Sequence, residues 1–195
     1  MRYFIIYKPF NTLSQFSKEG THATFADLNF DFPKDVYPVG RLDADSEGLL
    51  ILTNDTALNH RLLNPKFKHN RTYWVQVDGQ ITPEALQALS KGVVISIDGK
   101  KHQTLPAQAK LLATEPTLPE RNPPIRFRKN IPTSWLSLTL HEGKNRQVRR
   151  MTAAVGFPTL RLVRWAIESV LLADMQVGEV REVDKKWLFD KLKID

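Results

Sequence analysis

Short strand-like segments separated by turn residues recur along most of the chain, and no other feature limits its possible folds as much. Apolar runs, and apolar residues that alternate with polar ones, are typical of strands buried on two faces or on one. Asp78-Gly79 and Asp98-Gly99 are typical of turns between strands. The expected strands are residues 3–7, 49–52, 73–77, 107–113, 135–140, 159–170 and 180–183.

Helix signals are fewer, and the helices that they predict are short. Thr82-Pro83 combines a capping threonine with a proline at the first helical position, and Gly92 suits the end of the same helix. The expected helices are residues 24–28, 56–63 after a cap among residues 53–55, 83–91, 145–155 closed by Gly156, and 185–192 after Asp184. This mixture predicts an α+β fold: a mixed, mostly antiparallel sheet with flanking helices.

The length of 195 residues suits one domain, or two small lobes around a cleft. Cysteine is absent, which excludes disulfides and thiolate metal sites. The first residues hold too short an apolar run for a signal peptide, and no stretch of the sequence approaches the length of a membrane span. We therefore expect a cytoplasmic monomer with no membrane partner and no obligate protein partner.

The formal charge of +7 is concentrated in one part of the chain. Residues 121–150 hold eight basic residues and a single acid, Glu142, so this stretch carries the whole net charge. Such a distribution predicts a surface for a polyanion, although an ordinary solvated face would look the same. Five prolines within residues 115–132 also predict a long exposed loop there.

Three acids at alternating positions, Asp43, Asp45 and Glu47, form an acidic turn just before the apolar run 49–52. The first half of an EF-hand calcium loop has this spacing, but its twelfth position is Asn54 where a bidentate glutamate is needed. A solvated turn without a role is a second interpretation. The third is a carboxylate nucleophile held at the edge of a rigid sheet.

Residues 40–43 (Gly-Arg-Leu-Asp), followed by Asp45-Ser46 and Gly48-Leu49-Leu50, resemble the signature of the RsuA/RluA-type pseudouridine synthases. Residues 71–75 and 142–151 resemble that family's second and third motifs, and a strand containing Leu162 follows in the expected place. The resemblance implies the pseudouridine synthase fold with a central catalytic cleft. It also implies isomerisation of a specific uridine to pseudouridine in ribosomal RNA, without cofactor or metal.

The resemblance also implies roles for single residues. Asp43 is the expected nucleophile, Arg149 its charge partner, and Tyr73 the ring that stacks on the target base. Arg41 is expected to fill the gap left by the flipped-out base, and Leu162 to form an apolar wall of the pocket. Simpler interpretations exist for three of them: a core tyrosine, a core leucine, and a phosphate contact for Arg149.

Many family members begin with an RNA-binding domain of the S4 type, whereas this sequence begins directly with the strand at residues 3–7. It therefore most resembles the stand-alone members that modify large-subunit ribosomal RNA. The side chains expected to bind the RNA backbone are Arg126, Arg128, Lys129, Lys144, Arg146 and Arg150.

Two other classes of function fit parts of the sequence. A non-catalytic module that binds ribosomal RNA explains the basic stretch but not the acidic turn, which would repel phosphates. A metal-dependent nuclease would use the three acids, but the five histidines show no pair at ligand spacing.

Overall fold

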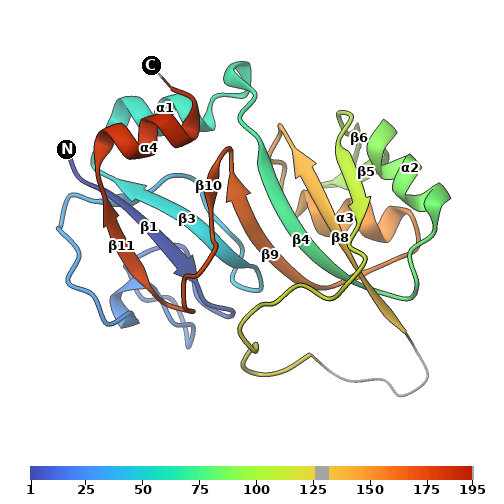
Figure 1. The fold of residues 1–195 in the computed structure, drawn as a ribbon, viewed down its shortest axis with the longest axis horizontal. Helices are drawn as coiled ribbons and strands as arrows, with labels where there is room; N and C mark the ends of the chain where they lie inside the picture. Colours follow the sequence, from blue (N-terminus) through green and yellow to red (C-terminus); the bar gives the residue numbers. More distant parts are fainter. Residues whose placement is uncertain (126–131, 195) are drawn as a thin grey trace. The chain divides into compact units, whose positions relative to one another are not determined.

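The computed structural model describes residues 1–125 and 132–194. The chain forms two compact units. Unit 1 comprises Met1–His69 and Val163–Asp195, and unit 2 comprises Asn70–Leu162. The strand β9 (Thr159–Ile167) contributes its first residues to unit 2 and the others to unit 1 (Figure 1).

Unit 1 is built on an antiparallel sheet in which β1 lies between β3 and β11. Its strands are β1 (Tyr3–Lys8), β2 (Tyr37–Pro38), β3 (Glu47–Thr53), β10 (Val170–Leu171), β11 (Val180–Val183) and the second part of β9. The start of β3 pairs in parallel with β9, and β10 folds back on β9 as an antiparallel partner. Both β1 and β3 are buried along their whole length, which explains their nearly continuous apolar sequences.

The two α-helices of unit 1 begin at side-chain caps in the places where the sequence predicts them, one among residues 53–55 and one at Asp184. Asp55 accepts hydrogen bonds from the N–H groups of Ala57 and Leu58, and Asp184 accepts from those of Lys186 and Trp187. The helices are the 3-10 turns η1 (Phe25–Asp27) and η2 (Pro65–Phe67), and the α-helices α1 (Thr56–Leu63) and α4 (Lys185–Leu192). The apolar core beside the sheet includes Phe4, Ile6, Phe25, Val36, Leu50 and Leu52.

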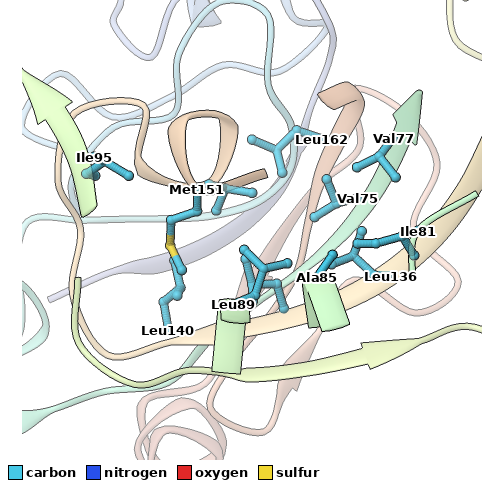
Figure 2. Packing of buried hydrophobic residues seen from close by; sticks show 12 residues of the cluster. Val75, Val77, Ile81, Ala85, Leu89, Ile95, Leu136, Leu140, Met151 and Leu162 are labelled. Carbon is cyan, nitrogen blue, oxygen red and sulfur yellow. The ribbon is translucent and has the colours of Figure 1, made fainter. Parts of the chain in front are cut away.

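Unit 2 has an antiparallel sheet in which β8 lies between β4 and β7. Its elements are β4 (Arg71–Asp78), α2 (Pro83–Lys91), β5 (Val94–Ile97), β6 (Lys100–Gln103), β7 (Gln108–Leu111), β8 (Thr133–Leu140) and α3 (Gln147–Ala154). The core joins α2, α3 and β5 to β4 and β8. Figure 2 shows Met151 of α3 pointing toward Leu140 of β8, with Leu89 of α2 in the same cluster.

The predicted α+β fold with a mixed, mostly antiparallel sheet is confirmed, and the expected strands and helices are found with small shifts at their ends. Two expectations were wrong in detail. Residues 159–170 are a hairpin of β9 and β10, because Glu168 takes a positive φ of 49° and reverses the chain. Glu47, expected in the acidic turn, is the first residue of β3 and is buried.

No helix within residues 1–125 and 132–194 combines the length and the apolar character needed to cross a membrane.

Candidate active site

Hydrogen bonds of its backbone groups hold the segment that carries Asp43 in place within unit 1. The Ser14 hydroxyl donates to the Leu42 carbonyl at 2.7 Å and accepts from the Leu42 N–H at 3.0 Å. The Ser46 N–H donates to the Asp43 carbonyl at 3.0 Å, which closes the turn. Leu42 and Ser46 are buried, whereas Asp43 between them is only half-buried. The backbone thus holds a reachable carboxylate on a rigid support.

Gly48 lets β3 and β9 approach closely behind this turn. Its Cα lies opposite Arg164 in the register, and a Cβ at Gly48 would lie 2.4 Å from the Arg164 carbonyl oxygen. Its φ of +111° is also one that other residues rarely adopt. The Arg164 guanidinium donates through Nε to the Leu49 carbonyl at 2.7 Å. A glycine at this position is therefore required by packing and by backbone conformation.

Two buried cations accompany the acidic turn. Lys8 is completely buried at the end of β1, and its Nζ donates to the Pro9 carbonyl at 2.9 Å and the Ala44 carbonyl at 3.3 Å. Arg164 is also buried, with 4% of its surface exposed. Sequence reasoning missed both as members of the site; the signal was a lysine at the end of a wholly apolar strand.

Burial lowers the pKa of Lys8 from 10.5 to about 7. The charges of Glu47, Asp45 and Asp43 oppose that change, in decreasing order, and the positive charge of Arg164 adds to it. Lys8 therefore lies within electrostatic reach of all three acids of the turn.

Glu47 does not complete a calcium loop. It is the first residue of β3 and is 2% exposed. In the described part of the chain, no group of three or more histidine, cysteine, aspartate or glutamate side chains is arranged to hold a metal ion.

The remaining predicted residue of unit 1, Arg41, is exposed two positions before Asp43. Its guanidinium donates to the side-chain carbonyl of Gln15 at 3.1 Å. Arg41 is thus an exposed side chain that a hydrogen bond joins to Gln15.

Tyr73 and Leu162 belong to unit 2. Tyr73 lies on β4 opposite Leu138 of β8, and its half-buried ring packs against the core of the unit. Leu162 is a member of that core with 5% of its surface exposed (Figure 2). Both side chains thus have a packing role in addition to any role at a substrate.

In the third motif, hydrogen bonds of Gln147 and Glu142 take the place of a side-chain cap at the start of α3. α3 begins after Arg146, which has a φ of 50° and makes no capping bond with its side chain. The buried Gln147 instead accepts from the Lys144 N–H at 2.9 Å and donates to Glu142 Oε1 at 2.7 Å. The same oxygen of Glu142 accepts from the Leu105 N–H at 2.8 Å. The glutamate therefore fixes the start of the helix, which was not foreseen from sequence.

The basic side chains of this motif differ in their surroundings. Lys144 and Arg146 are exposed, whereas Arg149 is half-buried and its Nη1 donates to the Thr159 carbonyl at 3.5 Å. Arg150 donates to the carbonyl of Ser96 and to the backbone and side-chain oxygens of Asn145. Arg150 thus has structural partners, and Lys144 and Arg146 are exposed.

The predicted residues are divided between the two units. Unit 1 holds Arg41 and Asp43, together with the buried Lys8 and Arg164, and unit 2 holds Tyr73, Lys144, Arg146, Arg149, Arg150 and Leu162. The predicted RNA-binding residues Arg126, Arg128 and Lys129 lie outside the described residues.

Comparisons with known proteins agree with these motifs. The family model described as RNA pseudouridylate synthase matches residues 2–154. Ribosomal large subunit pseudouridine synthase E of Vibrio parahaemolyticus is 52% identical over 180 residues, covering 92% of this chain and 72% of the relative. The protein of the same name in Xanthomonas campestris is 50% identical over 182 residues, covering 93% and 95%.

A crystal structure of a pseudouridylate synthase superposes with a TM-score of 0.79 at 28% identity, covering 98% of this chain and 73% of the other. This likeness confirms the pseudouridine synthase fold that the motifs implied. The chain belongs to the RNA pseudouridylate synthase family, whose members are isomerases.

Proposed function

We propose that this chain isomerises a specific uridine of large-subunit ribosomal RNA to pseudouridine, with Asp43 as the nucleophile. The substrate class is carried over from the names of the two relatives that share half of their residues with it. Bacterial ribosomal RNA is made and matured in the cytoplasm, which is where the proposed reaction takes place.

The observation that carries the proposal is the setting of Asp43. The reaction breaks the N–C glycosidic bond and forms a C–C bond between the same sugar and base, so it needs an anionic nucleophile and a base that stays bound. Asp43 stands half-buried on a turn whose neighbours on both sides are tied down. Arg164, and Lys8 when it is protonated, place positive charge behind that turn. A carboxylate so supported can attack without first having to be positioned.

The other roles in the proposal follow the family resemblance. A stacked nucleotide hides the reacting atoms, so the target must leave its helix, and Arg41 would take its place there. Tyr73 would stack on the detached base, and Leu162 would offer it an apolar contact. Arg149 would be the charge partner of the nucleophile. Half-burial of Tyr73 and Arg149 is compatible with these roles, since each side chain keeps part of its surface accessible.

Binding of the RNA backbone is proposed for the exposed basic residues. Lys144 and Arg146 face solvent, and Arg150 lies next to them with three of its nitrogens already bonded. Phosphate contacts of this kind give affinity without sequence preference.

One experiment separates this proposal from a non-catalytic RNA-binding module and from a metal-dependent nuclease. The protein is incubated with unmodified large-subunit ribosomal RNA in the presence of EDTA, and pseudouridines are then mapped along the RNA. We expect one new pseudouridine with the chelator present. RNA that is cleaved only without EDTA would favour the nuclease. RNA that is bound but unchanged would favour the module, and both results contradict the proposal.

A further inference from the structure

The free edge of the β5–β6 hairpin is hydrogen-bonded to the third motif, residues 142–151. Asp98 and Gly99 form its two-residue turn, so Ile97 and Lys100 are the first pair, and Ser96 and Lys101 the next. In such a hairpin the second pair directs its backbone groups away from the partner strand. The Arg150 guanidinium of α3 donates to that outward carbonyl of Ser96. The free edge of β5 therefore lies beside α3.

A second connection ties the other strand to the same motif. His102 Nε2 of β6 lies 3.3 Å from Glu142 Oε2, and the other oxygen of Glu142 holds Gln147 at the start of α3. Ile95 of β5, which lies opposite His102, is 3% exposed and belongs to the core of unit 2. The Arg150–Ser96 and Glu142–His102 contacts, together with the buried Ile95, thus hold the hairpin against residues 142–150.

These connections gather exposed positive charge around one small area. Lys101 lies opposite Ser96, whose carbonyl accepts a hydrogen bond from Arg150. Arg150 also donates to Asn145, which lies between Lys144 and Arg146 in the sequence. Neighbouring strands are only about 4.8 Å apart, and the two other steps are hydrogen bonds of the Arg150 guanidinium. Lys100, Lys101, Lys144 and Arg146 are all exposed.

Little negative charge offsets these cations. Asp98 is the sole acid in the sequence of the hairpin, and the oxygens of Glu142 are already used inside the protein. A hairpin with two exposed lysines and a single acid, beside the exposed Lys144 and Arg146, suits a phosphate backbone.

We propose that the β5–β6 hairpin extends the RNA-binding surface, with Lys100 and Lys101 contacting phosphates of the ribosomal RNA on either side of the hairpin tip. The inference rests on the proposed function, and it names a part of the protein that the sequence motifs do not include. Because successive residues of a strand point to opposite faces, the two lysines reach two different phosphates.

The test is a series of binding measurements with unmodified large-subunit ribosomal RNA transcribed in vitro, at several salt concentrations. Each phosphate contact contributes roughly 0.7–0.9 to the slope of log K against log salt. We expect K100A/K101A to lower the magnitude of that slope by about 1.4 to 1.8 and to weaken binding. The charge-preserving variant K100R/K101R should retain the wild-type slope.

The matched control is K186A/K191A, which removes two exposed lysines from α4. It should bind RNA with the wild-type slope, and thermal unfolding should show that all variants are folded. An unchanged slope for K100A/K101A, or an equal loss in the control, would overturn the inference. A wild-type protein that forms no pseudouridine would instead contradict the proposed function. The two failures are therefore distinguishable.

Discussion

In unit 1 the charges that accompany the acidic turn are inside the protein. Lys8 is fully buried, and Glu47 and Arg164 are nearly so. In unit 2 the basic residues Lys144 and Arg146 face solvent, and the half-buried Arg149 and Arg150 donate to backbone carbonyls.

The contrast shows two different uses of charge in one small protein. Buried charges are screened little by salt, have fixed positions, and are costly unless they are compensated. Exposed charges cost little, but salt weakens their attraction for a polyanion. Chemistry that needs a fixed nucleophile suits the first setting, and binding to many phosphates suits the second. The predictions below test whether the two units divide the work in this way.

The largest expected effect is that of Asp43→Asn. An amide cannot act as the nucleophile but fills the same volume, so we expect pseudouridine formation to vanish while the fold and RNA binding persist. Loss of a nucleophile in a well-studied hydrolase costs on the order of 10⁶ in kcat. The measurement is pseudouridine formed in ribosomal RNA. Asp45→Asn, which removes the same charge from the same turn, is the matched control and should retain activity. Turnover by purified Asp43→Asn protein would remove Asp43 from the role.

The next effect tests whether unit 2 also takes part in the chemistry. Tyr73→Phe keeps the ring, and with it the packing against the core of unit 2, but removes the hydroxyl. If that hydroxyl takes part in the proton transfer when C5 loses its hydrogen, the variant should stall late, with a loss of roughly 10²–10⁴-fold. Tritium release from 5-tritiated uridine in the RNA measures this step, alongside a binding assay. Release at the wild-type rate would reduce Tyr73 to a stacking platform and leave the proton transfer to another group.

Lys8→Met tests the buried charge of unit 1 through the pH dependence of stability. The pKa of Lys8 is lowered to about 7 in the folded protein and is near 10.5 when the chain is unfolded. Between these values the unfolded chain binds the extra proton, so the free energy of unfolding should rise with pH by up to about 1.4 kcal/mol per pH unit. This stabilisation is complete above pH 10.5 and is lost as pH falls from 10.5 to 7.

Other groups titrate in the same range, so the informative quantity is a difference between two proteins. Denaturant unfolding at pH 7 to 10 should give a steeper rise for the wild type than for Lys8→Met. Lys110→Met, at an exposed lysine of β7, should behave like the wild type. Parallel curves for the wild type and Lys8→Met would show that Lys8 does not carry the pH dependence.

The fold could be predicted from sequence where local signals agree with the tertiary structure. Thr82 and Asp184 cap the helices that they were expected to cap, and Asp55 is the one of the three candidates at residues 53–55 that caps its helix, since capping depends on residues close in sequence. The hairpin of β9 and β10 was missed because Glu168, which reverses the chain with a positive φ, is not a usual turn residue.

The candidate site was predicted through its motifs, and its supporting contacts were not. Lys8 is far in sequence from the acids whose charges it feels, and nothing local indicates their proximity. Glu142 was counted as the single acid of a basic stretch and as the first residue of the third motif, with no structural role. Its contacts with His102 and Leu105 depend on how β6 and the residues after it fold back toward residue 142. The pattern of apolar and polar residues does not show this.

The smallest expected effect comes from a comparison of RNA binding after loss of basic residues from the stretch 121–150 with RNA binding after loss of the buried Lys8. Replacing Arg126, Arg128 and Lys129 with alanine should lower the magnitude of the slope of log K against log salt by roughly 2.1–2.7, if each contacts one phosphate. Binding to unrelated RNAs should weaken alike, because phosphate contacts carry no sequence information. Lys8→Met removes a cation too, but a buried one that cannot release a counterion from RNA, so its slope should equal that of the wild type. An unchanged slope for the triple variant would mean that these residues do not touch the backbone. A reduced slope for Lys8→Met would mean that this buried lysine also contributes to binding of the RNA backbone.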